Sequence, residues 1–262
     1  QFRHRPLNGS TLPPLGPLLN PRYDGLWFGL ALLALWQALY HVVGDQGLAS
    51  PWETAERLGG LLGSVSFWGN AGATAAAVAW AIVYTVVGGL AIGLLLGLSR
   101  LAGAVAEPIL SALYAIPKIT LYPVILLMFG LGLPAKVAFG VAHGIFPVII
   151  LTMSGVRATR PVILKTARAL RLSPFDTIRT VLLPAALPEI MTGLRIGIVL
   201  AMLGALIGEF FAADRGLGFL LMRGVEQGDV ATTMALAMLL FTVAVLSGIG
   251  LLALDRRLRH GR

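Results

Sequence analysis

Long apolar runs separated by short polar segments form the main pattern of this chain. Six runs are long enough to cross a lipid bilayer, which takes about 20 residues of helix at about 1.5 Å of rise each. They lie at about 26–43, 73–98, 105–130, 135–155, 190–212 and 231–254. Pro117, Lys118 and Pro123 interrupt the third run. The pattern predicts an all-α membrane protein with about six transmembrane helices.

A polar segment, 157–188, separates the fourth run from the fifth. It carries six of the twenty Lys and Arg residues and a single acidic residue, Asp176. Pro161 suits the first turn of a helix, and 162–172 contains neither Gly nor Pro. A basic loop of this kind either docks on a soluble partner or only fixes the topology and touches anionic lipid.

A second helix start follows in the same segment. Ser173 is able to cap this helix, Pro174 suits its first turn, and Asp176 completes a turn like a capping box. We expect the helix at about 174–181, ending before Pro184 and a further proline at 188. Two short helices joined by a bend would form a compact knob below the membrane.

The predicted knob has an apolar contact face. Phe175, Ile178 and Leu182 lie at helical spacing and would supply that face. Arg171 and Arg179 would surround it with positive charge. Such a face is suited to docking on a soluble protein.

Composition and charge narrow the class further. Hydrophobic residues make up 57% of the chain and charged residues 12%, about half of the charged share of an average soluble domain. The net charge of +8 lies in loops and chain ends, which argues against a nucleic-acid partner. The absence of cysteine excludes a disulfide framework and a thiolate metal site. No cleavable signal peptide is visible at the polar start of the chain.

The distribution of Lys and Arg predicts the orientation of the chain in the membrane. With the N-terminus inside, fifteen of these residues fall on the cytoplasmic side and four on the outer side. We therefore expect a cytoplasmic tail at 1–24, a transmembrane domain at 25–254 and a basic cytoplasmic tail at 255–262. The segment 50–64 would then lie outside, and its start at 50–53 (SPWE) predicts a capped helix along the membrane face.

Short motifs accompany the polar segment on both sides. They are 115–118 (AIPK), 129–130 (FG), 155–157 (GVR), 185–190 (AALPEI), 193–197 (GLRIG), 208–209 (GE) and 215–219 (RGLGF). Together they resemble the binding-protein-dependent inner-membrane permeases of bacterial ABC importers, in particular the nitrate, sulfonate and taurine branch. The resemblance covers about 50–254. The family's signature loop reads Glu-Ala-Ala, three residues, Gly, nine residues and Ile/Leu-x-Leu-Pro.

This chain departs from the signature loop at two positions. Lys165 to Ala167 stand where the family has Glu-Ala-Ala, Arg171 stands at the Gly, and Pro184 ends the motif. Lys165 reverses a charge, and Arg171 is costly if that position needs a positive φ. Either the loop packs differently, or the ATPase partner has changed to match, or the chain is the less constrained half of a heterodimer.

The resemblance implies a type I ABC importer permease fold with a cytoplasmic coupling helix. It implies a second permease subunit, identical or different, two cytoplasmic ATPases and an extracytoplasmic solute-binding protein, in the bacterial inner membrane. The solute would be small, and the branch suggests an anion such as a sulfonate, taurine or nitrate. The chain has no P-loop, so we expect it to be no enzyme and to bind no cofactor, with ATP and Mg on the ATPases.

The resemblance and the predicted knob together assign a set of coupling residues. They are Lys165, Ala167, Arg171, Ser173, Pro174, Phe175, Asp176, Ile178, Arg179 and Pro184. ATP-driven closure of the ATPases would move the short helix and so tilt the spans between inward-open and outward-open states.

Ionisable residues inside the spans are candidates for the transport pathway, because burying charge in a membrane is costly. Lys118 would attract an anion at the proline break; alternatively it snorkels or pairs with Glu107 or Glu209. Glu209 would gate the pathway or hydrogen-bond a neighbouring helix. His143 is a helix–helix hydrogen-bonding group or a ligand. No second His or carboxylate at metal spacing accompanies it, so we expect no metal site.

Glycines recur at spacings of four in two of the runs. Gly93 and Gly97 in the second run form a small-xxx-small pair, and the pairs Gly193/Gly197 and Gly204/Gly208 do the same in the fifth. Such spacing predicts close helix packing.

Two other classes of membrane protein are compatible with the pattern. A gradient-driven secondary transporter would show two repeated halves and ionisable relays within the spans, and few such relays occur here. A non-transporting accessory subunit would be compatible with the changes at Lys165 and Arg171.

Overall fold

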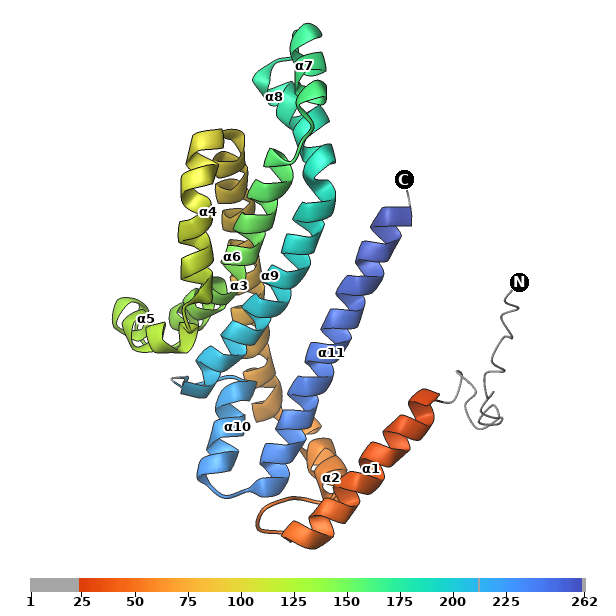
Figure 1. Ribbon diagram of the computed structural model, residues 1–262. Helices are drawn as coiled ribbons and strands as arrows, with labels where there is room; N and C mark the ends of the chain where they lie inside the picture. Colours follow the sequence, from red (N-terminus) through yellow and green to blue (C-terminus); the bar gives the residue numbers. More distant parts are fainter. Residues whose placement is uncertain (1–23, 212, 261–262) are drawn as a thin grey trace, which may run out of the picture.

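Helices dominate the computed structural model, which describes residues 24–211 and 213–260 and has no strand within them (Figure 1). The α-helices are α1 (Asp24–Val43), α2 (Pro51–Leu62), α3 (Val65–Leu98), α4 (Arg100–Ala115), α5 (Tyr122–Phe129), α6 (Leu133–Arg157), α7 (Pro161–Ala169), α8 (Pro174–Thr177), α9 (Leu183–Phe211), α10 (Leu217–Glu226) and α11 (Val230–His260). A 3-10 turn, η1 (Lys118–Leu121), precedes α5, and a π turn, η2 (Ile178–Leu182), precedes α9.

The described helices confirm the prediction of about six spans. Those long and apolar enough to cross a membrane are Gly25–Val43, Val65–Leu98, Leu133–Arg157, Pro174–Phe211 and Val230–Gly250. A sixth is obtained when Arg100–Ala115 and Lys118–Phe129 are counted together, although they meet at 86°. The tail predicted at 1–24 lies outside the described residues except for Asp24, and α11 continues through the predicted second tail as far as His260.

The break in the third span has a local cause. Proline disfavours the helical conformation in the residue before it, and Ile116 is extended, with ψ of 130°. Pro117 is extended as well, so α4 ends there and the chain turns into α5. Pro123, by contrast, lies in the first turn of α5, so it begins a helix rather than interrupting one.

The predicted helix after Ser50 is confirmed with its cap. The Oγ of Ser50 accepts a hydrogen bond from the backbone N–H of Glu53 at 3.2 Å, and the Glu53 carboxylate accepts one from the backbone N–H of Ser50 at 2.9 Å. This reciprocal capping box holds the start of α2, with Pro51 in its first turn. Helix α2 lies at the same end of the molecule as α10 (Figure 1).

The prediction that a helix ends before Pro184 and Pro188 is wrong. Helices α8 and α9 are continuous through η2, and together they form one apolar segment, Pro174–Phe211. In η2 the backbone N–H of Leu183 bonds to the carbonyl of Ile178, five residues back. This wider turn directly precedes Pro184. In a regular α-helix the proline ring would clash with the carbonyl four residues earlier, and the π turn relieves this clash.

Close packing of α6 against α3 and α9 forms the centre of the molecule. A Cβ placed on Gly93 would lie 2.7 Å from the Cβ of Thr152, and one on Gly97 would lie 2.8 Å from that of Val156. On the other side of α6, a Cβ on Gly197 would lie 2.8 Å from the carbonyl oxygen of Gly144. The predicted small-residue packing is therefore confirmed.

This packing predicts a strong asymmetry between two glycines of α3. Gly93→Leu would push into Thr152 and the backbone of α6, whereas Gly72→Leu meets open space. Overpacking costs about 1–3 kcal/mol, so we expect Gly93→Leu to lower the midpoint of thermal unfolding in detergent by about 3–10 °C. Gly72→Leu is the matched control and should unfold like the wild type. Equal midpoints for both variants would contradict the packing described.

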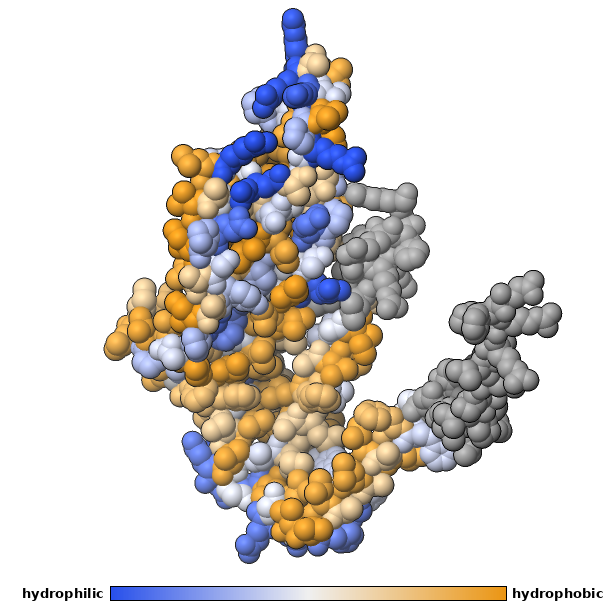
Figure 2. Space-filling view, viewed as in Figure 1, coloured by the Kyte–Doolittle hydropathy of each residue, from blue (hydrophilic) through white to orange (hydrophobic). Residues whose placement is uncertain are grey.

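The surface divides into an apolar belt and two polar ends. Figure 2 shows hydrophobic residues around the middle of the molecule and hydrophilic residues gathered at the two ends. One polar end is formed by α7 and α8, beyond the tips of the other helices, and the other lies near α2 and α10 (Figure 1). This division fits a chain that crosses a membrane once per long helix.

Candidate functional site

The knob, residues 161–182, consists of α7, α8 and η2. Helix α7 begins at Pro161, as predicted, and a bend at 170–173 leads into α8. The knob extends past the other helices at one polar end of the molecule (Figure 1). The predicted helix starts at Pro161 and Pro174 and the bend between them are therefore confirmed.

The bend has the geometry of a Schellman motif, with Arg171 at its left-handed position. The N–H of Leu172 donates to the carbonyl of Ala167 at 3.1 Å, and the N–H of Arg171 donates to that of Arg168 at 2.9 Å. Arg171 has φ of +54° and is the only non-glycine residue with positive φ within 24–211 and 213–260. The loop thus keeps the conformation that favours Gly, although Arg occupies the position, and it has not been repacked to avoid the strain.

We expect Arg171→Gly to stabilise the knob. A residue with a Cβ loses about 1–2 kcal/mol of folding free energy in the left-handed conformation. Glycine avoids this strain, although it loses more backbone entropy on folding, which offsets part of the gain. Arg171→Ala is the control, because it deletes the charge and keeps the Cβ. Hydrogen exchange at the Leu172 amide should slow in the glycine variant relative to the alanine variant. Equal rates in the two variants would contradict the strain assigned to Arg171.

The predicted cap of α8 is confirmed. The Oγ of Ser173 accepts a hydrogen bond from the N–H of Asp176 at 3.1 Å and donates one to its carboxylate at 2.6 Å. Pro174 occupies the first turn. Ser173 and Asp176 therefore fix the start of α8, and with it the direction in which Phe175 points.

The predicted apolar face of the knob is only partly correct. Phe175 is 69% exposed, but Leu182 is buried and Ile178 packs beside it against the ends of α6 and α7. These two residues lie on the side of the helix that faces Val156, so they hold the knob to the bundle instead of facing outward. Within the predicted face, only Phe175 presents a large apolar side chain to the surface.

Three further apolar residues of the knob are exposed, and the sequence analysis did not include them in the contact face. Val162 is 70% exposed, Leu170 is 68% exposed and Ile163 is 41% exposed. The Arg171 and Arg179 side chains are exposed as well. A group of exposed apolar side chains with a polar rim is typical of a protein contact surface. The amphipathic pattern of α7 indicates that one of its faces is apolar. Which residues of α7 turn inward depends on how the bend packs, and the sequence does not show that.

The signature-loop positions divide between the surface and the core. Ala167 is buried against the bend, while Lys165 is exposed on α7. Pro184 is exposed on the first turn of α9. The charge reversal at Lys165 therefore changes the surface of the knob and leaves its interior unchanged.

Lys118 lies at the break between α4 and α5, as predicted. Its Nζ donates to the backbone carbonyl of Tyr114 and lies 4.5 Å from the centroid of the Tyr114 ring and 5.6 Å from that of Phe146. The alternative pairing with Glu107 is wrong, because Glu107 bonds to Arg157 at 2.8 Å. Aromatic rings and a carbonyl, rather than a carboxylate, surround this cation.

His143 lies one turn from Phe146 on α6. Its Nδ1 lies 2.9 Å from the carbonyl oxygen of Phe139 in the same helix, so the predicted hydrogen bond to another helix is wrong. The ring instead packs against Gly204 of α9, where a Cβ would lie 2.8 Å from it. The Nζ of Lys118 therefore lies beside Phe146, one helical turn of α6 from His143.

Glu209 is buried, with 1% of its surface exposed, and it does not pair with Lys118. Its carboxylate accepts hydrogen bonds from Thr74 at 2.8 Å and from the N–H of Gly218 at 3.0 Å, and it lies 3.6 Å from the Nζ of Lys136. The predicted contact with neighbouring helices is confirmed. Every partner belongs to another segment, so Glu209 joins α3, α6, α9 and α10.

Lys136 is one of the four basic residues counted on the outer side, at the start of the fourth apolar run. It lies in the first turn of α6 with 3% of its surface exposed, and its Nζ also donates to the carbonyl of Arg215. Counting charges along the sequence cannot distinguish a loop lysine from one that turns inward to a carboxylate. Lys136 is therefore a structural residue that the sequence analysis missed.

The same contacts hold the segment between α9 and α10. Thr74 accepts a hydrogen bond from the N–H of Leu217 at 2.8 Å, and Asn70 accepts one from the N–H of Gly216 at 2.8 Å. We call Asn70, Thr74, Lys136 and Glu209, with the backbone of 215–218, the Glu209 network. It fixes α10 to the end of the bundle opposite the knob.

A second clasp at this end joins α2 to α11. Arg57 bonds to Asp229 at 2.8 Å, and Asp229 caps α11 by accepting from the N–H of Thr232 at 2.9 Å. Burial alone would raise the pKa of the Asp229 carboxyl, but the hydrogen bonds from Thr232 and the Arg57 guanidinium outweigh it and lower that pKa. Since the folded-state pKa is depressed, the clasp stabilises the fold above pH about 4 and is lost as the pH falls further.

The Asp229→Asn variant isolates the charge of this clasp, because asparagine still caps the helix. An exposed ion pair contributes about 0–1 kcal/mol, so we expect the thermal midpoint at pH 7 to fall by about 1–4 °C. The difference from wild type should shrink below pH about 4, where Asp229 becomes protonated. A difference that is constant from pH 7 to pH 3 would contradict the ion pair.

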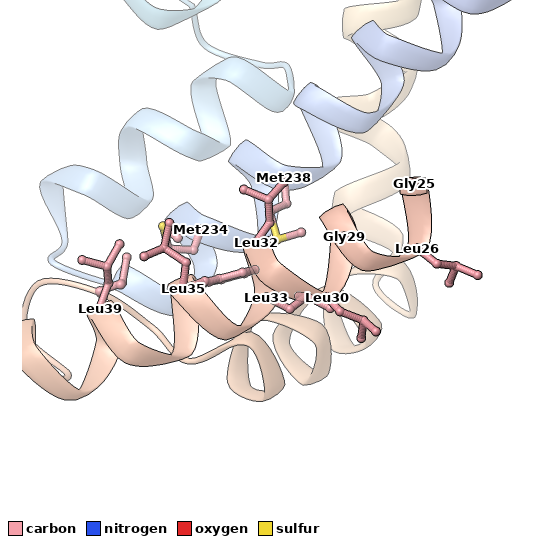
Figure 3. Close-up of a pocket in the computed structure, with 12 residues that line it drawn as sticks. Gly25, Leu26, Gly29, Leu30, Leu32, Leu33, Leu35, Leu39, Met234 and Met238 are labelled. Carbon is pink, nitrogen blue, oxygen red and sulfur yellow. The ribbon is translucent and has the colours of Figure 1, made fainter. Parts of the chain in front are cut away.

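Two grooves on the apolar belt have almost entirely apolar linings. One, of about 770 Å³, lies between α1 and α11, and Figure 3 shows Leu32 and Leu35 of α1 directed toward Met238 and Met234 of α11. The other, of about 750 Å³, lies between α3, α5 and α6 beside Trp80. In the described part of the chain no three His, Asp or Glu side chains are grouped to hold a metal ion.

Comparison with known proteins places this geometry in context. The family described as "Binding-protein-dependent transport system inner membrane component" matches residues 89–260. The taurine transport system permease protein of Escherichia coli is 29% identical and is matched over 90% of this chain and 86% of its own length. The riboflavin transport system permease protein of Chloroflexus aurantiacus is 35% identical over 84% of each chain.

A solved structure shares the fold. A chain from the MetNI methionine ABC transporter, in a set of inward-facing conformations, superposes with a TM-score of 0.59 at 22% identity. The match covers 71% of this chain and 92% of the other. The predicted permease-like helical fold is therefore confirmed.

Proposed function

This chain belongs to the binding-protein-dependent transport system inner membrane component family, and we propose that it is the permease subunit of an ATP-driven importer. Its spans form half of a solute pathway, and a second permease subunit, identical or different, supplies the other half. The chain catalyses no reaction. ATP and Mg²⁺ bind to two separate ATPase subunits, and an extracytoplasmic binding protein delivers the solute.

The observation that carries this proposal is the exposed apolar surface of the knob. Val162, Leu170 and Phe175 are exposed beyond the apolar belt, and Arg179 is exposed four residues after Phe175. A loop that only fixed topology would have no reason to present apolar side chains to water. The knob is suited to docking on an ATPase, and Ile178 and Leu182 would transmit its movement into α9 through their packing.

The orientation follows from docking. If the knob faces the cytoplasm, α2 and α10 face the outside, where a binding protein arrives (Figure 1). The C-terminal end of α11 points toward the level of the knob, which supports a cytoplasmic C-terminus. The excess of Lys and Arg on that side agrees with this arrangement in a bacterial inner membrane.

For the solute we propose a small anion such as taurine, another sulfonate or nitrate. Lys118 supports this choice, because it is partly buried in a broken span and its contacts there are aromatic rings and a carbonyl. A cation held without a carboxylate favours a negatively charged solute. The similarity to a riboflavin transport protein makes riboflavin the control solute.

Affinity isolation of this chain from its native membrane in mild detergent tests the proposal. We expect two copies of a P-loop ATPase to copurify, with ATP hydrolysis stimulated by a solute-binding protein. The complex in lipid vesicles should import radiolabelled taurine or nitrate, and a Lys118→Met variant should import less. Isolation of the chain without an ATPase would contradict the importer assignment and favour an accessory or gradient-driven protein.

A further inference from the structure

A cavity of about 1260 Å³ lies between the knob and the ends of the long helices. Its walls come from the last turns of α3 and α6, the first two turns of α4, and the inner faces of α7 and α8. It is distinct from the outward surface of the knob, because Val162, Leu170 and Phe175 do not line it.

Positive charge is concentrated in this cavity. Arg100, Arg157, Lys165 and Arg168 line it, against a single acidic lining residue, Glu107. Arg157 neutralises Glu107 through the contact of 2.8 Å between them. Within the described residues no ion pair forms with Arg100, Lys165 or Arg168, so three cations converge on the space without a counter-charge.

The side chain of Arg157 is held in a fixed position in the wall of the cavity. A Cβ on Gly103 of α4 would lie 2.9 Å from the Cδ of Arg157, so the absence of a side chain there lets Arg157 lie across α4. This contact and the bond to Glu107 hold the guanidinium between α4 and α6.

The apolar part of the wall limits the kind of anion. Leu98, Leu164 and Leu182 line the cavity, and Leu98 ends a helix of the apolar belt. The volume far exceeds that of one phosphate ion. A phospholipid matches both parts of the wall, because its phosphate meets the cations and its glycerol and upper acyl carbons meet the leucines.

We propose that this cavity binds the headgroup of an anionic phospholipid, and that the lipid fills the space between the knob and the spans. The lipid phosphate contacts Arg100 and Arg168, and its tails continue along the end of α3. The site belongs to the permease itself and includes neither Lys118 nor the exposed Val162, Leu170 and Phe175. Lys165, Pro174 and Ile178 of the coupling set line its wall on the side of the knob.

Native mass spectrometry of the full-length chain in neutral detergent tests the site. We expect one phosphatidylglycerol to stay bound under conditions that remove phosphatidylcholine. In Arg100→Gln/Arg168→Gln the apparent affinity for phosphatidylglycerol should fall by roughly 30-fold, since each cation near a lipid surface contributes about fivefold. Arg179→Gln is the matched control, because Arg179 is an exposed cation of the knob that does not line the cavity.

Three results would overturn the proposal. The first is equal phosphatidylglycerol binding by the double variant and the wild type. The second is displacement of the lipid by millimolar inorganic phosphate, which would show a site for free phosphate. The third is complete loss of the lipid when the copurified ATPase is bound, which would show that a protein side chain occupies the cavity. Arg100 and Arg168 are exposed, and the single variant Arg168→Gln repeats the test if the double variant does not fold.

Discussion

Phe175→Ala is expected to uncouple ATP hydrolysis from import while the chain still folds and inserts into the membrane. Phe175 is the exposed aromatic residue at the start of α8, and its side chain is directed outward by the Ser173–Asp176 cap. A buried aromatic anchor in a protein interface commonly contributes about 2–4 kcal/mol, which corresponds to roughly 30-fold or more in affinity. Import per ATP hydrolysed, measured in reconstituted vesicles, should fall by at least about tenfold.

Arg179→Glu tests the same surface through its charge. Reversing an exposed cation four residues after Phe175 should weaken docking and lower import as well. Phe28→Ala is a matched control, because Phe28 is equally exposed but lies on α1, far from the knob. Normal import by both knob variants would rule out the assignment of the knob to coupling.

Lys136→Met is expected to be the most destabilising substitution at the opposite end of the molecule. It would leave the carboxylate of Glu209 buried, with its remaining hydrogen bonds from Thr74 and Gly218 but without a cation. Removing one partner of a buried ion pair costs about 3–5 kcal/mol. Thermal unfolding in detergent should show a loss of about 6–20 °C.

The double variant Lys136→Met/Glu209→Gln separates the cost of an unpaired buried carboxylate from the loss of the packing contacts of Lys136. A neutral amide still accepts from Thr74 and Gly218, so most of the lost stability should return. Arg57→Met breaks the exposed pair with Asp229 and should cost less than about 1 kcal/mol. A Lys136→Met variant as stable as Arg57→Met would contradict the buried network.

Several features of the fold could be predicted from short stretches of sequence. Helix starts at Ser50 and Ser173 were predictable because a capping side chain and its partner lie three residues apart. The proline break before Lys118 and the strain at Arg171 follow from the conformational limits of single residues. Each of these features depends on residues that are close together in the sequence.

The features that could not be predicted depend on residues far apart in the chain. Lys136 and Glu209 meet only because α6 packs along α9, so the count of charges registered Lys136 as an outer-side cation and gave no sign of its buried partner. The inward direction of Ile178 and Leu182 depends on the position of Val156. The continuity of α8 with α9 depends on a π turn, for which the sequence has no simple signal.

Cysteine crosslinking at the knob tests the central claim most directly. The chain contains no cysteine, so Ala169→Cys introduces a single thiol on the exposed side of the knob and keeps Phe175, and Glu226→Cys introduces one at the opposite end. In native membranes, we expect a bifunctional thiol–amine reagent to join Ala169→Cys to an ATP-binding subunit, and ATP to change the yield. We expect no such product from Glu226→Cys. Absence of the product at Ala169→Cys, or equal yields at the two positions, would contradict the docking of this permease on an ATPase through its knob.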